Sequence, residues 1–407
     1  MKRILVLGAG FAGLIAAVGA ARKLAELNIG KDDIAVSVVN RDLWHAIRVR
    51  NYETDLSDVR VQLEDVLGPI NVDLVVGEVA GIDCERRTVT VNQDGGVEAL
   101  GYDRLVFALG SELVRPPIPG LAEYGFDIDT YDAAARLSAH LEGLPGRPAS
   151  PGRFTALVVG GGLTGVEAAA ELATRLRAIA GAEASRVILA DRAARIGSNM
   201  GDGACTVIDA ALGALEVETR PGVTIASVEA EGARLASGES IAAATVVWCG
   251  GMRAHPLAAS LPGRHDRFGR VEVDRFLRVT AADGVFAAGD VAAALVDGEH
   301  ASVMSCQHAR PMGRIAGHNA VCDMLGEPMI PIDIGWYVTC LDLGEWGAVY
   351  TEGWDRRVAA TGAAAKETKR TINCVRIYPP RSRDPAEILA AAAPVVQAPP
   401  RQPPTGR

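Results

Sequence analysis

Two glycine-rich stretches with the same spacing constrain the fold of this chain more than any other feature. Each has the pattern G-x-G-x-x-G directly after a short apolar run; the glycines are Gly8, Gly10 and Gly13 in the first and Gly160, Gly162 and Gly165 in the second. A helix-compatible segment and a second apolar run follow each stretch. Strand, glycine turn, helix and strand form the βαβ unit that holds a dinucleotide. There the first glycine permits the turn, the second lets the backbone approach the pyrophosphate, and the third lets helix and strand pack closely.

The start of the chain has a second interpretation. Lys2 and Arg3 precede an uncharged stretch from Ile4 to Ala21. A basic start with an apolar middle is typical of a secretory signal peptide. The second glycine unit favours the folded alternative, because two such units in one chain arise by chance far more rarely than one. We therefore expect the first stretch to be part of the fold.

The residue that ends the second strand of each unit indicates which nucleotide the unit binds. It is Asn40 in the first unit and Asp191 in the second. A carboxylate at this point accepts hydrogen bonds from the adenosine 2′-OH and repels a 2′-phosphate, so Asp191 favours NADH. Arg192 and Arg195 stand nearby and are compatible with a 2′-phosphate, which keeps NADPH as the alternative. The amide of Asn40 can still donate to and accept from ribose hydroxyls.

Composition narrows the class of protein further. A chain of 407 residues has room for two or three domains, and its hydrophobic content of 49% supports a large core. The net charge of −9 argues against a nucleic-acid-binding surface. The seven cysteines are widely spaced and form no C-x-x-C motif, so they predict neither a disulphide framework nor a metal site. This pattern favours a cytoplasmic protein.

Five stretches in order resemble the flavoproteins with two dinucleotide-binding domains, the pyridine-nucleotide oxidoreductases that use FAD and NAD(P)H. Besides the two glycine units, the stretches are Tyr102–Ser111, Val246–Pro256 and Gly284–Ala292. The resemblance implies that the first unit holds FAD and the second NAD(P)H. It adds Gly110 and Gly251 to the cofactor-binding residues. It also places Gly289 and Asp290 in a second FAD signature, where the carboxylate meets the ribityl chain.

The order of these stretches predicts an α/β fold with two Rossmann-like domains and a small C-terminal α+β interface domain. We expect an FAD-binding domain in two parts, 1–112 and 253–330, around an NAD(P)H-binding domain at 113–252. The interface domain is expected at 331–385 and a disordered, Pro-rich tail at 386–407. Early in that tail, "AEILAAAAPVV" predicts a short helix, too weakly amphipathic to anchor the chain by itself.

The second half-reaction divides this family, and the cysteine pattern excludes several branches. The first cysteine is Cys84, so the chain lacks the FAD-domain cysteines of disulphide, peroxide and coenzyme A disulphide reductases. What remains resembles the type II NADH dehydrogenases, which are NADH:quinone oxidoreductases. These carry an arginine and then an aromatic–His pair after the second strand, matched here by Arg41, Trp44 and His45. Packing beside a loop is the alternative role for Trp44 and His45.

The resemblance also implies a site for the acceptor. The quinone motif of the family, Ala-Gln-x-Ala-x-Gln, corresponds to "CQHARP", in which Gln307 and Ala309 match while Cys306 and Pro311 replace the first Ala and the second Gln. Cys306 is then expected beside the flavin, either as an inert buried thiol or as an electron relay.

Two further features concern charged side chains. Glu167 stands where the family often places a carboxylate near the nicotinamide and flavin; the alternative is an acidic residue that favours the helix dipole. Lys366, Lys369 and Arg370 form a basic segment near the C-terminus. We expect a solvated basic face there, with contact to anionic lipid as the alternative.

Together these features predict an FAD-containing NADH oxidoreductase that passes electrons to a quinone or a similar acceptor. We expect at most weak peripheral contact with the cytoplasmic face of the membrane. The sequence leaves open whether the chain forms a homodimer. One alternative is a reductase of a small electron-transfer protein such as a ferredoxin or rubredoxin, which the acidic net charge weakly disfavours. Another is an NADH-sensing flavoprotein with little turnover.

Overall fold

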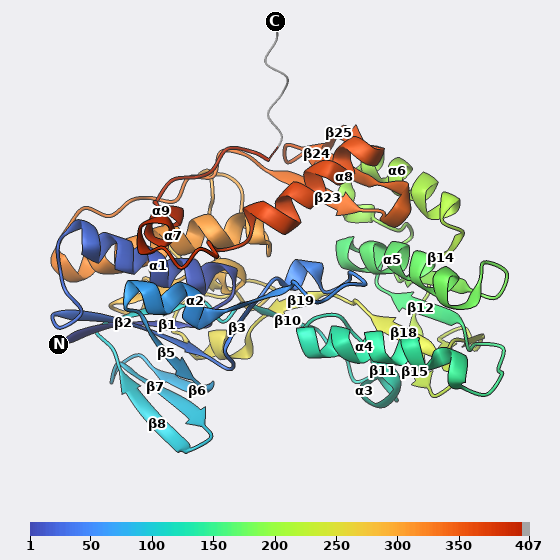
Figure 1. The fold of residues 1–407 in the computed structure, drawn as a ribbon, viewed down its shortest axis with the longest axis horizontal. Coiled ribbons are helices and arrows are strands. Elements are labelled where there is room, and N and C mark those ends of the chain that lie inside the picture. Colours follow the sequence, from blue (N-terminus) through green and yellow to red (C-terminus); the bar gives the residue numbers. More distant parts are fainter. Residues whose placement is uncertain (401–407) are drawn as a thin grey trace, which may run out of the picture.

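The computed structural model describes residues 1–400 and shows two α/β domains side by side, with C-terminal elements lying across both (Figure 1). The first domain is built on a parallel five-stranded sheet in the order β21-β9-β1-β2-β5. Its strands are β1 (Lys2–Leu7), β2 (Ile34–Asn40), β5 (Asp73–Val76), β9 (Arg104–Phe107) and β21 (Val285–Ala287). The last strand comes from far along the chain and completes the sheet beside β9.

The central strands of this sheet have no polar face, since helices cover one side and strands of the first domain share the core with it. The four residues Ile4 to Leu7 of β1 are fully buried, as a strand covered on both sides requires. Helix α1 (Phe11–Glu26) packs against α7 (Cys306–Leu325) through small residues. A Cβ at Gly313 or Gly317 of α7 would lie 2.2 or 1.9 Å from a carbonyl oxygen of α1. The start of α7 is thereby brought close to the first glycine loop.

The second domain repeats this plan. Its parallel sheet has the order β11-β18-β12-β13-β14. The strands are β11 (Gly125–Phe126), β12 (Thr155–Val159), β13 (Arg186–Asp191), β14 (Val217–Pro221) and β18 (Thr245–Trp248), and the main helices are α4 (Tyr131–Gly143), α5 (Leu163–Ala180) and α6 (Asp202–Ala214). Each domain also carries a three-stranded antiparallel sheet, β6-β7-β8 in the first and β15-β16-β17 in the second. The predicted pair of Rossmann-like domains is confirmed.

Shorter elements complete the two domains. The antiparallel sheets consist of β6 (Glu78–Asp83), β7 (Thr88–Gln93) and β8 (Gly96–Gly101), and of β15 (Ile225–Glu229), β16 (Gly232–Leu235) and β17 (Ser240–Ala242). The remaining pieces are β3 (Trp44–Ala46), β4 (Arg60–Gln62), α2 (Leu63–Leu67), α3 (Leu121–Tyr124), β20 (Val271–Glu272) and β22 (Ala292–Ala293). Where the chain crosses between the domains, β10 (Ser111–Leu113) pairs antiparallel with β19 (Met252–Ala254).

The C-terminal part forms a third layer over the two domains (Figure 1). Strands β23 (Val338–Asp342), β24 (Ala348–Glu352) and β25 (Arg357–Thr361) form an antiparallel sheet, which α8 (Gly362–Thr371) and a π-helical turn (Ile372–Arg376) follow. Leu341, Leu343 and Val349 are buried in the core of the second domain. This sheet therefore anchors the C-terminal part on the second domain.

The tail differs from its prediction. The short helix predicted there is present as α9 (Pro385–Ala391), but order continues to residue 400. Arg314 Nε donates to the carbonyl oxygen of Ala391 at 3.1 Å, and Trp336 Nε1 donates to that of Gln397 at 3.0 Å. The structure thus differs from the expected disorder at 386–400, because main-chain carbonyls of the tail accept hydrogen bonds from side chains of the folded domains. Residues 401–407 of the predicted tail lie outside the described residues. Among residues 1–400, no helix is both long and apolar enough to cross a membrane.

Candidate active site

One cavity of about 1850 Å³ is lined by both glycine loops and by the start of α7. Its volume exceeds the roughly 300–1,000 Å³ of an ordinary small-molecule pocket, so it has room for two dinucleotides. Most of the predicted site residues line it: Gly8, Gly10, Asn40, Arg41, Gly110, Gly160, Gly162, Glu167, Asp191, Gly251, Gly289, Asp290, Cys306 and Gln307. Three predicted residues, Gly13, Gly165 and His45, are not among its lining residues.

Gly13 and Gly165 instead join each helix to its loop. A Cβ at Gly13 would lie 1.8 Å from the carbonyl oxygen of Gly8. The second loop repeats this contact, with 1.7 Å between a Cβ at Gly165 and the oxygen of Gly160. Any side chain would push helix and strand apart. These two glycines are therefore packing residues behind the loops.

Gly10 and Gly162 differ, because the protein itself does not exclude a side chain there. Both line the cavity, and no protein atom lies within 4 Å of the position of a Cβ on either glycine. They are the N-cap residues of α1 and α5, with no side-chain cap, so the first N–H groups of each helix remain free for a ligand. Space and free donors at a helix N-terminus fit a pyrophosphate. Both loops therefore fit the phosphates of a dinucleotide.

Asn40 and His45 both form hydrogen bonds with the backbone of Ala9 in the first loop. The Oδ1 of Asn40 accepts from the backbone N–H of Ala9 at 2.9 Å, and its Nδ2 donates to the carbonyl of Asp42 at 2.9 Å. The Nδ1 of His45 lies 2.8 Å from the carbonyl oxygen of Ala9. Burial lowers the pKa of His45 to about 4, so its ring is neutral. The packing alternative therefore describes His45, whereas Trp44 lines the cavity.

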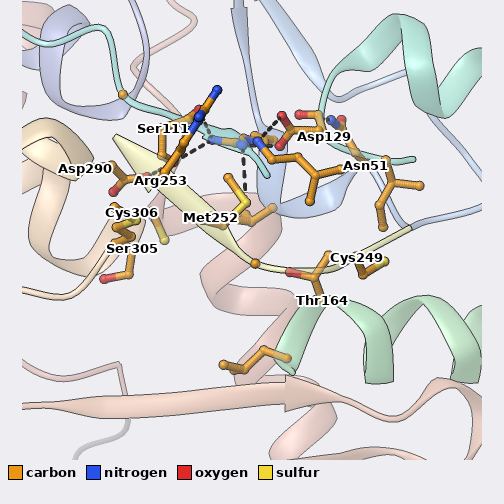
Figure 2. Close-up of a pocket in the computed structure, with 18 of the residues that line it drawn as sticks. Asn51, Ser111, Asp129, Thr164, Cys249, Met252, Arg253, Asp290, Ser305 and Cys306 are labelled. Atoms are coloured by element: carbon orange, nitrogen blue, oxygen red, sulfur yellow. Dashed lines mark hydrogen bonds and ion pairs between the residues drawn. The ribbon is translucent and has the colours of Figure 1, made fainter. Parts of the chain in front are cut away.

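The second FAD signature joins a network that reaches into the second domain (Figure 2). The hydroxyl of Ser111 donates to Asp290 Oδ2 at 2.6 Å. Arg48 donates to the carbonyl of Ser111 at 2.9 Å and forms an ion pair with Asp129. Burial raises the pKa of Asp290, and the Ser111 hydrogen bond opposes that rise. Ser111 thus holds the Asp290 carboxyl in place on the cavity wall.

Asp191 is fixed by the second loop. Its Oδ2 accepts from the backbone N–H of Gly161, and its Oδ1 from that of Ala193 at 2.6 Å. Arg195 pairs with Asp209 at 2.9 Å and so is already engaged by a carboxylate, whereas Arg192 lines the cavity. The site therefore presents a carboxylate and a single neighbouring arginine at the end of β13.

Cys306 and Gln307 lie at the first turn of α7. The Oε1 of Gln307 accepts from the backbone N–H of Val338 at 3.2 Å, which ties α7 to β23. Burial raises the pKa of the Cys306 thiol, so the thiolate is disfavoured. Pro311 is buried inside α7 away from the cavity and adds no polar group to it.

Glu167 forms a buried ion pair with a residue that was expected on a solvated face. Its Oε1 accepts from Lys369 Nζ at 2.7 Å and from the backbone N–H of Asp342 at 3.0 Å. Burial raises the pKa of Glu167, while the Lys369 ammonium works against that rise. Burial disfavours the charge of Lys369, but the Glu167 carboxylate outweighs it and raises the pKa of Lys369.

The prediction of a solvated basic face on α8 is therefore wrong for two of its three residues. Lys369 is only 8% exposed and Lys366 pairs with Asp342 at 2.5 Å, whereas Arg370 is exposed as expected. Lys366 and Lys369 are three residues apart, so they share one helix face. That face is turned toward α5 and β23, because the C-terminal sheet folds back over the second domain.

Sequence reasoning missed several cavity residues because they lie in none of the motifs. They are Tyr52, Tyr337, Arg356 and Lys369. The hydroxyl of Tyr52 donates to Asp342 Oδ2 at 3.2 Å. Within residues 1–400, no group of three or more His, Cys, Asp or Glu side chains is arranged to hold a metal ion.

The profile of the pyridine nucleotide-disulphide oxidoreductase family matches residues 2–313. The chain belongs to this family, and it is therefore an NAD(P)H-dependent flavoprotein oxidoreductase. The fold class and the enzyme class predicted from the motifs are confirmed.

Individual proteins are also similar. An NADH dehydrogenase-like protein of Mycobacterium tuberculosis is 54% identical over 400 residues, covering 98% of this chain and 99% of its own length. A type II NADH:quinone oxidoreductase of Staphylococcus saprophyticus is 28% identical over 352 residues, covering 80% of this chain and 84% of its own. The structure of NDH2 from Plasmodium falciparum in complex with NADH matches with a TM-score of 0.75 at 13% identity, covering 95% of this chain and 97% of that one. The last comparison shows the fold alone.

Proposed function

We propose that this chain is an NADH:quinone oxidoreductase with FAD at the first glycine loop and NADH at the second. The observation that carries the proposal is the single cavity that both loops share with Glu167 and Gln307. The printed name of the Staphylococcus saprophyticus relative supports a quinone as the acceptor. Asp191 favours NADH over NADPH, because its carboxylate at the end of β13 repels a 2′-phosphate.

When bound, FAD supplies the two-electron chemistry between the nicotinamide and the acceptor. The chain supplies placement and electrostatics. Gly10 and Gly162 leave space for the two pyrophosphates, and Asp290, fixed by Ser111, faces the cavity where the ribityl chain is expected. Cys306 contributes a neutral thiol that fills space beside the flavin.

Two polar side chains of the cavity suit the second half-reaction. Gln307 uses its Oε1 for the backbone of Val338, and its amide nitrogen lies 3.3 Å from His308 Nε2. The second N–H of that amide can donate to a quinone oxygen. Reduction of a quinone by NADH takes up one proton from solvent. We assign the Glu167–Lys369 pair to pass on that proton, because both side chains line the cavity and Lys369 Nζ lies 2.7 Å from Glu167 Oε1.

The test is anaerobic stopped-flow absorbance of the flavin-loaded protein, with NADH added first and a soluble quinone second. The wild type should bleach quickly and recover quickly. Gln307→Ala should bleach as the wild type does and recover at least about tenfold more slowly. Gln93→Ala is the matched control, since Gln93 lies in β7 and is bonded to Glu98.

The other outcomes separate the alternatives. Bleaching without recovery in the wild type would refute the quinone acceptor and favour a small redox protein as acceptor or an NADH sensor. Equal recovery in the wild type and Gln307→Ala would remove Gln307 from the acceptor site. A purified protein without flavin would contradict the assignment of the first loop.

A further inference from the structure

Arg356 is a cation in the cavity for which residues 1–400 supply no acidic partner. It lies in the turn between β24 and β25, is half-buried, and lines the cavity. Its Nη1 lies 3.3 Å from the sulphur of Met200, and its guanidinium carbon lies 5.2 Å from the ring centre of Tyr337. Neither neighbour is an anion, and a thioether is a weak acceptor. In the part of the chain that the structure describes, Arg356 therefore lacks a carboxylate partner.

Neighbouring cations are placed differently. Arg357, the next residue, pairs with Glu352 at 3.7 Å, and its side chain is 73% exposed. Lys369 is paired with Glu167 at 2.7 Å. An arginine that faces a cavity and remains without an anion is suited to a ligand that brings the negative charge.

The turn that carries Arg356 is rigidly supported. Arg356 has φ of +55°, in the left-handed region that is strained for a non-glycine residue. Its N–H donates to the carbonyl of Gly353 at 3.0 Å, and the N–H of Gly353 donates to that of Tyr337 at 2.9 Å. Trp354 is stacked between Tyr337 and His300, with ring centres 4.3 and 4.4 Å away. The surrounding structure thus fixes the strained residue before any ligand binds.

The same turn contacts the loop that follows β13. A Cβ at Gly201 would lie 3.6 Å from the Cβ of Arg356. Ser198 and Asn199 of this loop line the cavity. The loop is bonded to the second glycine loop, since the N–H of Gly197 donates to the carbonyl of Gly161 at 2.8 Å. Arg356 therefore stands across the cavity on the side of the second glycine loop, where a pyrophosphate is expected.

We propose that Arg356 binds the pyrophosphate of the nicotinamide dinucleotide at the second loop, so that the C-terminal hairpin completes this nucleotide site. The inference rests on the proposed function, because it takes the second loop to hold NADH. The loop N–H groups approach the phosphates from one side, and Arg356 adds a charge-assisted, bidentate contact from another domain. The consequence is that nucleotide affinity depends on the C-terminal sheet.

The test measures binding rather than turnover. ADP-ribose, which has the pyrophosphate but no nicotinamide, and adenosine, which has neither, are titrated into the flavin-loaded protein by calorimetry. Arg356→Ala should weaken ADP-ribose binding about 10- to 100-fold, as expected for a lost charged hydrogen bond, and leave adenosine binding unchanged. Arg356→Lys should restore part of the loss. Arg357→Ala, the adjacent exposed arginine, should bind both ligands as the wild type does.

Each remaining outcome overturns the inference in a distinguishable way. If Arg356→Ala binds ADP-ribose normally, Arg356 does not bind the pyrophosphate, while the proposed function stands. If Arg356→Ala weakens the binding of adenosine as much as that of ADP-ribose, Arg356 acts on the structure of the site and not on the pyrophosphate. If the wild type binds neither ADP-ribose nor NADH, the proposed function itself fails. If Arg356→Ala does not fold, the ADP-ribose affinities of Arg356→Lys and Arg357→Lys are compared instead, since both variants retain the charge. Equal ADP-ribose affinity of those two variants would contradict a bidentate arginine contact.

Discussion

Replacing Lys369 with methionine tests the buried ion pair that joins α8 to α5. Both side chains of the pair are 10% exposed, and Nζ lies 2.7 Å from Oε1 of Glu167. At an effective dielectric constant of about 20, charges at this distance attract by ~6 kcal/mol, which is an upper bound. Removing one partner of a buried pair typically costs about 3–5 kcal/mol. We expect Lys369→Met to lower the free energy of unfolding by that amount at pH 8.

The loss should depend on pH. Without the ammonium, burial raises the pKa of Glu167 further in the folded protein. The folded state then binds more protons than the unfolded state, in which the pKa of a glutamate is about 4.3. Stability is therefore fully present below the unfolded pKa and is lost as the pH rises through the folded pKa. The destabilisation by Lys369→Met should be smaller at pH 5 than at pH 8.

The assay is urea unfolding of the wild type, Lys369→Met, Glu167→Gln and the double variant at both pH values. The double variant removes both charges of the pair, so it should recover about 2 kcal/mol relative to Lys369→Met. Arg370→Met, on the exposed face of α8, is the control and should change stability by less than about 0.5 kcal/mol. A loss below about 1 kcal/mol at pH 8, or a double variant no more stable than Lys369→Met, would refute the reasoning.

Three further predictions follow from single sites. Gly10→Val should purify with at least about tenfold less flavin per chain, measured by visible absorbance, because the valine side chain enters the cavity. Gly30→Val is the control, because Gly30 also has no protein atom near the position of a Cβ but lies outside the cavity, so this variant should keep its flavin. Equal loss of flavin in both variants would contradict the assignment. Asn319→Leu should lower the free energy of unfolding by about 2–4 kcal/mol in urea titrations, because it leaves the N–H and carbonyl of Ile330 and the carbonyl of Phe276 unpaired; an unchanged midpoint would count against this. Burial lowers the pKa of His45 to about 4, so the neutral ring contributes stability at neutral pH that is lost as the pH falls from about 6.5 toward 4, by up to about 3 kcal/mol. In His45→Gln the free energy of unfolding should therefore decline less steeply between pH 7 and 4.5. An unchanged slope would argue against burial of a neutral ring.

Local sequence determined the two dinucleotide-binding units. A tight turn at Gly8, close packing at Gly13 and an apolar strand before them depend on residues that are neighbours in sequence. The local sequence pattern therefore predicts the local geometry. The same holds for Gly10, because the free helix N-terminus behind it is set by the next few residues. The order of the remaining motifs then fixed the family, and with it the position of Asp290.

Only the tertiary structure decided which charged side chains are buried and which remain without a partner. Glu167 and Lys369 are 202 residues apart in sequence and meet because the C-terminal sheet folds back over α5. On the sequence, Lys369 is indistinguishable from the exposed Arg370 beside it. Arg356 and Met200 are likewise 156 residues apart. The free energy of a charge depends on the solvent and the charges that surround it in space, and three-dimensional neighbours from distant segments leave no local pattern in the chain.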